Sequence, residues 1–515
     1  MKKLLFSITL LVLTTAAANA QVPEDAIRYS WYPQNASARI LGAGGVMGSV
    51  GGDITAGYVN PAGIGFYRVS EAVFTSGFGL TNTKASYRGN TTKESSNAFS
   101  FGPSGAIIAR QQNRNNRSDA IAISFTQNAS FKNTIHYKGL NNYSSYAEQF
   151  AEEFSGLNKS ISEVLNTNSI APYTAAPALY TYLIDTVRVN GNLIVKAAPE
   201  YILDQGKALQ QDMIRNTKGG LYEVNLAYGS NLGAKWLWGA SVGIPLVNYE
   251  SNTVFSETDT SADQNNHFRS FSFTDNFTTK GAGVIARLGV IYRPKEYIRL
   301  GFAIHTPTYM TLTDSRQTTL HTIVENPVFD TTINSTMFTN GERGEAKYVQ
   351  TSPLRAVLSA SYVFREITEV SKQRGFLSAD IEYVNHNGSR FSSDSNQPTS
   401  GEKAYYKELN TVVKDIYKGN FNFRVGGELK FNTIMARLGF GYYGSPYKEA
   451  PSKANKMTFS GGLGYRNKGF FVDLTYVHLV TNDFDVPYRL AAAQNTYASL
   501  KQMRENVLAT VGVKF

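Results

Sequence analysis

The sequence contains no cysteine and only 3 tryptophans in 515 residues. Without cysteine, the chain forms neither a disulfide nor a thiolate metal site. Beyond residue 20, no apolar run approaches the roughly 18 residues that a membrane-spanning helix needs. If the chain enters a membrane, a closed barrel is therefore the remaining architecture, because open sheet edges leave backbone polar groups without partners in lipid.

The charged residues are not clustered in the sequence. The 50 Lys and Arg residues exceed the 40 Asp and Glu residues, which gives a formal net charge of +10. A basic balance can indicate a nucleic-acid partner. Here the basic residues form no dense run, so we interpret them as surface and lumen charge and predict no nucleic-acid partner.

Residues that carry catalysis or bind metals are also sparse. The 6 histidines lie apart without metal-ligand spacing, and neither a G-x-S-x-G elbow nor a phosphate-binding loop occurs. A loose dinucleotide fingerprint at Gly281 to Ala286 lies inside an alternating strand pattern, whereas that motif must open a helix. We predict no metal, no cofactor and no enzymatic activity. A hydrolase assembled from Ser, His and Asp on distant strands stays open as an alternative.

The first 20 residues have the features of a secretory signal peptide. Lys2 and Lys3 precede a mostly apolar stretch at 4–13, and Ala18-Asn19-Ala20 offers a small-x-small cleavage site. A membrane anchor is the alternative, but the apolar stretch is too short to span a bilayer as a helix. No cysteine follows the cleavage site, which excludes a lipoprotein.

Most of the remaining sequence alternates apolar and polar residues with a period of two, which is typical of β-strands. Side chains of opposite character then point to opposite faces of each strand. We predict fourteen strands, near 71–82, 97–109, 119–131, 220–230, 236–250, 268–292, 297–313, 346–364, 374–386, 420–431, 434–443, 457–466, 469–479 and 506–515.

The predicted connections are short on one side and long on the other. Such a rhythm is the layout of outer-membrane barrels, whereas a soluble sandwich does not need it. The sequence therefore predicts an all-β fold, a transmembrane antiparallel β-barrel over residues 71–515 in the bacterial outer membrane. An even strand number returns the carboxyl terminus to the periplasmic side. Long connections are predicted near 132–219, 251–267, 314–345, 387–419 and 480–505.

The last ten residues form a strand with one apolar face. About ten residues suffice for a tilted crossing of a bilayer. Terminal aromatic strands of this kind resemble the closing strand of bacterial outer-membrane barrels. The resemblance implies the barrel-assembly machinery as a partner during biogenesis. The apolar face comprises Val507, Ala509, Val511, Val513 and Phe515.

The long connection at 132–219 carries an apolar stripe with helical spacing. We predict a helix over 143–164, a hairpin that turns at Asn190-Gly191, and a second helix near 200–215. Strand parity places this insertion outside the cell. The stripe either packs on itself or on the barrel rim, or it forms a capture surface for a hydrophobic ligand. It includes Tyr146, Phe150, Phe154 and Leu157.

Residues 21–70 do not alternate and are rich in glycine. Nine glycines lie between Gly42 and Gly65, and such density permits positive φ angles and close packing. A compact segment before the first strand can fold back into the barrel lumen as a plug. The segment carries Asp53, followed by Asn60, Pro61, Ala62 and Gly63.

This segment resembles the hatch of FadL-type outer-membrane transporters of long-chain fatty acids and other hydrophobic molecules. The hatch of that family carries a small-residue stretch, an Asp and an Asn-Pro-Ala-Gly motif, which Asp53 and residues 60–63 match in order and spacing. The resemblance extends to Gly-rich strands at 281–294 and 423–446, and the family also uses fourteen strands.

The resemblance implies passive transport. A hydrophobic small molecule is captured outside, enters the barrel, and leaves when the hatch shifts or sideways through a wall opening. The partners implied are that ligand and outer-membrane lipids, and we expect a monomer. Some FadL-like proteins serve as scaffolds in protein export, so a structural or secretion-associated barrel without solute transport is the alternative.

Four arginines are predicted to face inward, where they could meet the carboxylate of a fatty acid. A guanidinium group binds carboxylates in a forked geometry. The alternative is that these arginines pair with the inward-facing Asp380, Glu382, Glu428 and Asp473 and fill the lumen. The four are Arg287, Arg299, Arg424 and Arg437.

Overall fold

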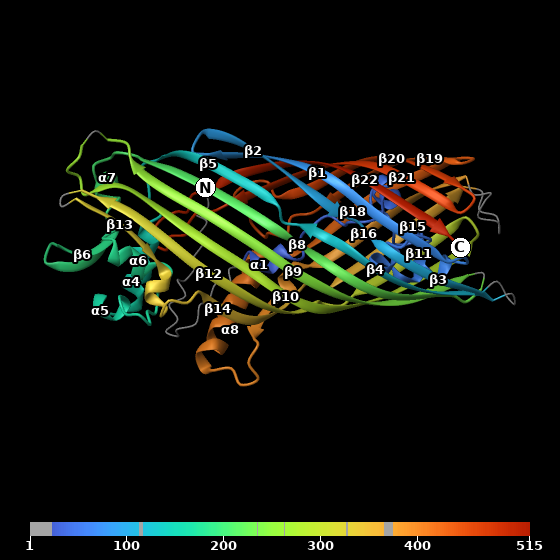
Figure 1. The fold of residues 1–515 in the computed structure, drawn as a ribbon, viewed down its shortest axis with the longest axis horizontal. Coiled ribbons are helices and arrows are strands. Elements are labelled where there is room, and N and C mark those ends of the chain that lie inside the picture. Colours follow the sequence, from blue (N-terminus) through green and yellow to red (C-terminus); the bar gives the residue numbers. More distant parts are fainter. Residues whose placement is uncertain (1–22, 113–116, 234, 262, 326–327, 365–373) are drawn as a thin grey trace.

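The computed structural model describes residues 23–112, 117–233, 235–261, 263–325, 328–364 and 374–515. They form an antiparallel barrel whose strands run obliquely along the long axis (Figure 1). The first and last wall strands close the ring, because β1 pairs with β22 from Glu71↔Lys514 to Ser86↔Ser499. The signal peptide predicted at 1–20 lies outside the described residues.

The wall has fourteen strand positions, which confirms the predicted number. At several positions two or three consecutive strands share one place in the wall, as β2 and β3 do beside β1. The strands are β1 (Glu71–Tyr87), β2 (Asn90–Phe101), β3 (Ser104–Gln112), β4 (Arg117–Ser130), β5 (Asn133–Asn141), β8 (Leu209–Asn231), β9 (Trp236–Asp259), β10 (Phe268–Lys295), β11 (Ile298–His305), β12 (Tyr309–Val324), β13 (Phe329–Asn334), β14 (Gly344–Thr351), β15 (Arg355–Phe364), β16 (Gly375–Asn385), β17 (Arg390–Ser393), β18 (Gly419–Phe431), β19 (Ile434–Tyr443), β20 (Asn455–Asn467), β21 (Phe470–Asp485) and β22 (Ala498–Lys514).

Outward-facing side chains form an apolar band at the short-turn end of the barrel. On β9 the exposed residues run from Trp236 to Leu246, and the next outward residues are Asn248 and Glu250. This band is about as tall as a tilted strand of ten residues, which fits the hydrocarbon layer of a bilayer. Because β1 pairs with β22, the first and last wall strands are joined, and the barrel can span a membrane.

The strands extend beyond the apolar band toward the long-loop end. β8 and β9 therefore begin or end well outside the predicted ranges of 220–230 and 236–250, whereas β10 begins at the predicted residue 268 and ends three residues beyond the predicted 292. In these extensions both faces carry many polar residues, so the alternation that marks a strand in the sequence is weak there. The same effect makes the predicted insertion too long, because 133–141 and 209–219 belong to the wall strands β5 and β8.

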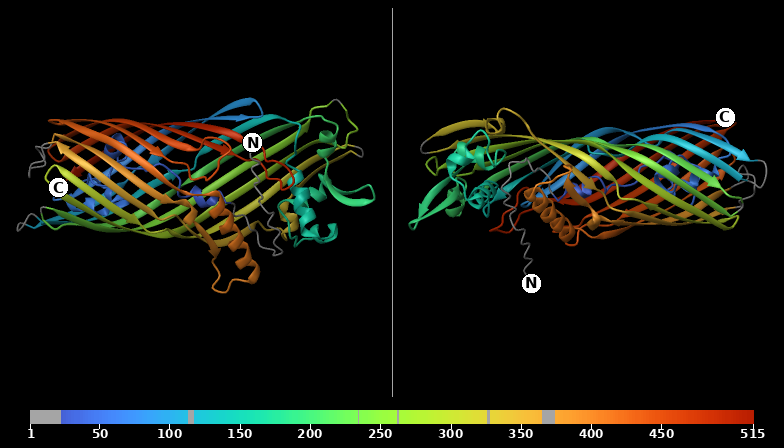
Figure 2. Two further views of the ribbon diagram at one scale, coloured as in Figure 1. Left: turned by 180° about the vertical axis from the view of Figure 1, so that it is seen from behind. Right: turned by 90° about the horizontal axis from the view of Figure 1, so that it is seen from below.

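The insertion spans 142–208 and lies across the long-loop end (Figures 1 and 2). The predicted hairpin is confirmed: β6 (Ile184–Val189) pairs with β7 (Asn192–Ala197), and Asn190 and Gly191 turn with φ of 52° and 83°. The helix predicted over 143–164 is two helices, α4 (Glu148–Leu157) and α5 (Ile161–Val164), separated by Asn158 with φ of 50°. The second predicted helix, near 200–215, was wrong beyond α7 (Glu200–Asp204), because strand pairing with β9 from residue 209 onward overrides helix formation.

The remaining helices are short, except for one that stands beside the barrel wall. That helix, α8, is visible as the orange projection in Figures 1 and 2. Among the described residues, no helix is both long and apolar enough to cross a membrane. The remaining helices are α1 (Asp25–Arg28), α2 (Ala38–Gly42), α3 (Ala56–Val59), η1 (Pro61–Phe66), α6 (Ala175–Tyr180), η2 (Ser335–Phe338), η4 (His386–Gly388) and α8 (Ser400–Ile416).

The carboxyl-terminal strand points its predicted apolar face outward. Val507, Val511 and Val513 are exposed on the barrel surface, whereas Leu508 and Thr510 face inward and are buried. Phe515 continues this outward face, and its backbone N–H donates to the Ser70 carbonyl at 3.0 Å.

Deletion of Phe515 is expected to lower the amount of folded barrel in the membrane fraction several-fold and to raise degradation before insertion. The deletion removes an aromatic anchor at the band edge and the terminal residue that the assembly resemblance implicates. Heat-modifiable migration on gels, with quantification of membrane fractions, measures the effect. Phe470→Ala is the matched control, because Phe470 is exposed on the neighbouring strand at the same end. Equal levels of the deletion variant and the control would contradict the assembly role.

Candidate functional site: the barrel lumen and its mouth

Residues 23–70, called here the amino-terminal segment, pack inside the barrel, with α1 near the middle of its length and the later part of the segment closer to the end where the chain terminates (Figures 1 and 2). Helix α2 lies against β20, β21 and β19. At Gly426 and Gly439 the wall has no side chain, and a Cβ atom there would collide with the backbone of Ala43 and Gly44. These wall glycines let the segment approach the strands backbone to backbone.

Polar side chains of the wall hold the backbone of the segment. Asp380 accepts the N–H groups of Met47 and Gly48 at 2.9 and 3.1 Å. Thr510 of β22, which lies five wall positions from the β16 strand of Asp380, accepts the N–H of Ala38 at 2.8 Å. Because these groups are buried, each hydrogen bond lost would leave a polar atom without compensation.

Asp53 organises a turn inside the segment. Its carboxylate accepts the hydroxyl of Ser37 at 2.8 Å, and the N–H and hydroxyl of Thr55 at 3.0 and 2.6 Å. Ser37 is the N-cap of α2, where its hydroxyl oxygen accepts the N–H of Ile40. Asp53 therefore links the turn before α3 to the start of α2, and it does not face the open lumen, being 8% exposed.

Asn60 joins the segment to the wall. Its side-chain amide donates to the Gly48 carbonyl at 2.6 Å and to the Val290 carbonyl of β10 at 3.2 Å. Its side-chain oxygen accepts the N–H of Ala62 at 3.1 Å, which caps the short helix η1. Gly289 has no Cβ to obstruct this contact. Asn60 is thus fully buried and uses both ends of its amide.

Pro61, Ala62 and Gly63 begin η1 and pack tightly. A Cβ at Gly239 of β9 would collide with Pro61 and Ala62, and Ala62 packs against Leu237 and Ile291. The φ of Gly63 is not positive. Its need for glycine comes from space, since a Cβ would lie 2.9 Å from the Cβ of Ala56 and 3.1 Å from the Cα of Gly51.

The inward-facing arginines are held by carboxylates or by backbone. Arg424 pairs with Glu382 at 2.9 Å, and Arg437 pairs with Glu428 and Asp473, each at 2.6 Å. Arg287 binds Glu223 through two hydrogen bonds of 2.6 and 2.9 Å. Arg424 and Arg437 thus pair with carboxylates that the lumen-filling alternative named, whereas Arg287 pairs with Glu223, which that alternative did not name.

Arg299 differs from the other three. It donates to the Val50 carbonyl at 2.5 Å and lies over the Phe66 ring, 4.5 Å from its centroid. It therefore ties the wall to the amino-terminal segment. Glu223, the partner of Arg287, was missed in the sequence, although it has the inward parity of the predicted strand at 220–230.

A small polar cavity of about 60 Å³ lies between the segment and the wall. That volume holds a few water molecules, because one water needs roughly 10–15 Å³ of such space. It is too small for a hydrophobic ligand in this state. Its lining includes Tyr32, Tyr58, Glu223, Arg287, His305 and Arg355.

The wall contains a seam between β2 and β5. β2 pairs with β1 and β5 pairs with β8, but in the described part of the barrel no backbone ladder joins β2 to β5. At the end of the seam nearer the short turns, the Asn35 side-chain amide donates to the Phe101 carbonyl of β2 at 2.9 Å and to the Gln127 carbonyl of β4 at 2.7 Å. The amino-terminal segment thereby bridges the two sides of the interruption.

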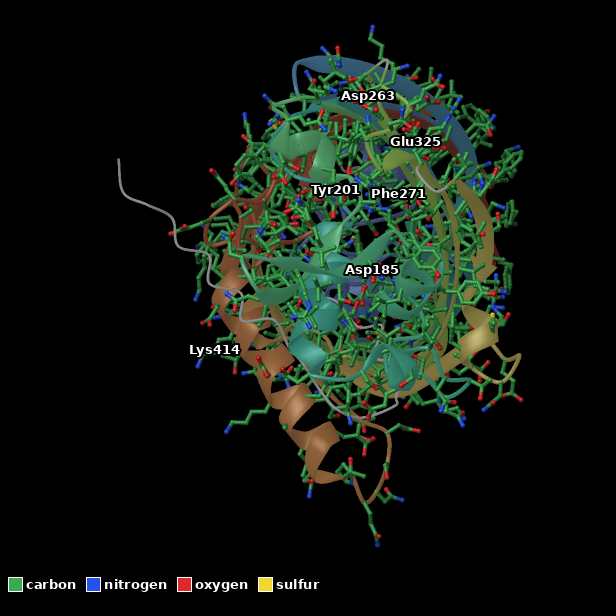
Figure 3. All side chains as sticks on the ribbon, turned by 90° about the vertical axis from the view of Figure 1, so that its left-hand side faces the viewer. Asp185, Tyr201, Asp263, Phe271, Glu325 and Lys414 are labelled. Carbon is green, nitrogen blue, oxygen red and sulfur yellow. The ribbon has the colours of Figure 1, made fainter. Side chains whose placement is uncertain are left out.

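The insertion covers the mouth at the long-loop end. Figure 3 looks into this end, where the elements that carry Asp185 and Tyr201 lie across the opening, and Phe271 is on the wall behind them. The predicted stripe is packed: Phe150, Phe154 and Leu157 are 0%, 5% and 8% exposed in a cluster with wall residues. The stripe therefore packs on the barrel in the observed state, as the first interpretation proposed.

Carboxylates fix the insertion to the barrel. Glu152 of α4 accepts the N–H groups of Ala491 and Ala492 at 2.7 and 2.9 Å. Within the insertion itself, Glu148 accepts the N–H of Ser145 at 2.6 Å. Burial raises the pKa of Glu148 to about 7, against the lowering effect of that hydrogen bond. Below that pH the site carries one negative charge fewer, beside Glu200 and Glu152.

The fold and lumen define a class: a closed fourteen-stranded transmembrane β-barrel with its amino-terminal segment packed inside. Neither a family model nor a curated protein matches the sequence. Among solved structures, the toluene transporter TodX of P. putida matches with a TM-score of 0.50 at 13% identity, over 94% of this chain and 99% of that chain.

Other solved structures match with similar extent. A FadL homologue of Pseudomonas aeruginosa gives a TM-score of 0.49 at 13% identity, over 93% of this chain and 98% of that one. The CymD monoaromatic hydrocarbon channel gives 0.47 at 10% identity, over 94% and 99% of the two chains. At such low identities, the match to TodX establishes a shared fold.

Proposed function

We propose that this protein is a FadL-type outer-membrane transporter for the passive uptake of long-chain fatty acids or other hydrophobic small molecules. The observation that carries the proposal is a lumen filled by a hydrogen-bonded, glycine-packed segment beneath an apolar mouth. A water-filled pore offers no favourable path to an apolar solute, whereas a sequence of apolar contacts does. The shared fold with a toluene transporter supports the proposal.

The amino-terminal segment serves as the hatch. The segment contacts both the seam, through Asn35, and the wall strand β10, through Asn60. A shift of the segment would release the Phe101 and Gln127 carbonyls as well as the lumen. A solute could then leave toward the periplasm or sideways through the seam.

The orientation follows from the loops. Short turns face the periplasm in outer-membrane barrels, and long loops face outward. The insertion at 142–208 therefore lies outside the cell, and its stripe at Tyr146, Phe150, Phe154 and Leu157 contributes to ligand capture once it opens. Outer-membrane lipids surround the apolar band, the barrel-assembly machinery inserts the protein, and the protein works as a monomer without enzymatic activity.

Deletion of the protein is expected to reduce uptake of at least one labelled hydrophobic solute, and the wild-type protein should restore it. The double substitution Pro61→Ala with Gly63→Val should change that uptake and increase leakage of small polar dyes, because the valine collides with Ala56 and Gly51. Uptake and dye entry are compared at equal surface abundance.

The matched control is Pro451→Ala with Gly461→Val. Pro451 is exposed, and the nearest atom to a Cβ at Gly461 is 3.5 Å away. If uptake of every tested hydrophobic solute is indifferent to the hatch variant and to deletion alike, the transporter proposal fails. A scaffold role would then be favoured over transport, and protein partners in the cell envelope should be sought by pull-down.

A further inference from the structure

The ring of Tyr146 sits inside a cage of aromatic side chains at the barrel mouth. It stacks on Phe255 with ring centroids 4.4 Å apart and an interplanar angle of 26°. The edges of other rings surround it, since Phe150 and Tyr488 lie at 5.5 and 5.6 Å with interplanar angles of 72° and 68°. Phe273 and Phe271 complete the cage at 5.7 and 6.3 Å.

The cage and its occupant come from different parts of the molecule. Phe255 belongs to β9, and Phe271 and Phe273 belong to β10, so the wall supplies most of the cage. Tyr146 instead lies in the loop before α4, outside the strand ladder, and side chains that include Gln211 and Tyr488 hold that loop by hydrogen bonds to Ser144. Glu257 accepts the Ser145 hydroxyl at 2.5 Å and the Tyr146 N–H at 2.7 Å. The occupant can therefore leave without disturbing the strand ladder.

A polar floor lies directly beneath the cage. Thr253, Arg215 and Asp275 stand opposite one another in the strand register, one inward position below Phe255. Arg215 pairs with Asp485 at 2.7 Å and Arg316 pairs with Asp275 at 2.9 Å.

These floor residues remain partly accessible. The side chains of Arg215 and Arg316 are 28% and 23% exposed, whereas that of Arg437 is 0% exposed. Burial raises the pKa of the Tyr146 hydroxyl, and Asp275, Arg316 and Arg215 are among the charged groups that also act on that pKa. The ring of Tyr146 thus lies among the aromatic rings of the cage, and its hydroxyl lies toward the polar residues of the floor.

We propose that this aromatic cage binds a hydroxylated monoaromatic compound of the phenol and cresol class, and that Tyr146 occupies the cage until such a ligand displaces it. The proposal rests on the transporter function proposed above and narrows its substrate class. The Tyr146 side chain is itself a para-substituted phenol, so the protein displays the chemistry that the cage accommodates. The floor favours a ligand with a hydroxyl group over a plain hydrocarbon.

The depth of the cage argues against a long acyl tail. Inward-facing residues on one strand are two positions apart, or about 6.6 Å along the strand. The floor is polar, and the row of Phe271 also contains Glu257 and Gln211, which are hydrogen-bonded to each other at 2.7 Å. The apolar layer is therefore about one or two rings deep. An extended tail would have to pass these ion pairs and displace water from them, at a cost in desolvation.

Because a ligand must displace Tyr146, its apparent affinity for the wild-type protein is lowered. A ligand that binds only the state with Tyr146 outside the cage has its affinity reduced by the fraction of molecules in that state. Tyr146→Ala removes the competing ring and should therefore bind p-cresol at least tenfold more tightly than the wild type. Tyr143→Ala is the matched control, because Tyr143 lies in the same loop, is 50% exposed, and does not contribute to the cage.

The experiment measures binding of p-cresol, toluene and oleate to the purified full-length barrel in detergent, by calorimetry and saturation-transfer NMR. We expect the wild type and Tyr143→Ala to bind p-cresol equally, and Tyr146→Ala to bind it more tightly. Toluene should bind about tenfold more weakly than p-cresol, because it forfeits roughly one hydrogen bond. Binding of p-cresol to Tyr146→Ala but not to the wild type would indicate a created cavity only, and would overturn the proposal.

Uptake assays separate this proposal from the function on which it rests. If deletion changes oleate uptake while the wild type does not bind p-cresol, the cage proposal is wrong and the transporter function stands. If the wild type and Tyr146→Ala bind p-cresol as expected while deletion changes no uptake, the cage stands and the transporter function fails. Preference of the wild type for oleate or toluene over p-cresol would also overturn the assigned ligand class.

Discussion

Replacing Gly439 by alanine is expected to make the barrel leak small polar dyes. A Cβ at this position of β19 would collide with the backbone of Gly44 and Ala43 in the amino-terminal segment. That neighbour is backbone with a left-handed Gly44, φ 76°, so it cannot yield by a side-chain rotation. The segment must move away from the wall.

Overpacking of this kind costs about 1–3 kcal/mol, which raises the population of a displaced segment roughly tenfold to a hundredfold. Entry of a small fluorescent dye into intact cells, normalised to the amount of folded barrel, measures the change. Gly461→Ala is the matched control on the neighbouring strand, because the nearest atom to its Cβ would be 3.5 Å away. If both variants exclude the dye equally well, the amino-terminal segment does not limit permeation of the dye through the barrel.

Replacing Arg437 by methionine is expected to destabilise the barrel by about 3–5 kcal/mol, the cost of leaving buried charges without their partner. Arg437 is fully buried between Glu428 and Asp473, and Asp473 is also fully buried. Glu428 keeps Arg39, at 3.1 Å, but Asp473 then relies on Arg466 at 3.6 Å. The loss should appear as a lower urea midpoint for conversion of the folded to the unfolded gel band.

Arg466→Met is the control for this second prediction. Arg466 is 29% exposed and lies farther from Asp473, so its removal should cost less than about 1 kcal/mol. Adding Asp473→Asn to Arg437→Met should recover part of the stability, because it removes one stranded charge. Equal unfolding midpoints for Arg437→Met and Arg466→Met would contradict a structural role for the buried ion pair.

The sequence predicted the wall well because burial in a barrel alternates residue by residue. The residue pattern of each strand distinguishes its two faces. The inward direction of Arg287, Arg424 and Arg437 could therefore be predicted without knowledge of the neighbouring strands. The parts that failed lie where this local signal fades. The outer extensions of β8 and β9 carry polar residues on both faces, and the segment after α7 enters β8 through pairing with β9.

The lumen could be predicted only in part. The motif identified Asp53 and residues 60–63, but it did not predict which contacts each of these residues makes. Asn60 reaches the Val290 carbonyl, 230 residues away in the chain, and Gly63 is required by the proximity of Ala56 and Gly51. The cage around Tyr146 combines four chain segments, and the approach of the two that are strands, β9 and β10, depends on strand register.

The sequence by itself determined the number of strands, their faces, the apolar band and the hairpin of the insertion, because each depends on the order of neighbouring residues. Only the tertiary structure decided which carboxylate each arginine meets, how the amino-terminal segment bridges the seam through Asn35, and which ring fills the mouth. Those contacts join residues far apart in the chain, and their geometry is fixed by closure of the barrel and the stagger of its strands.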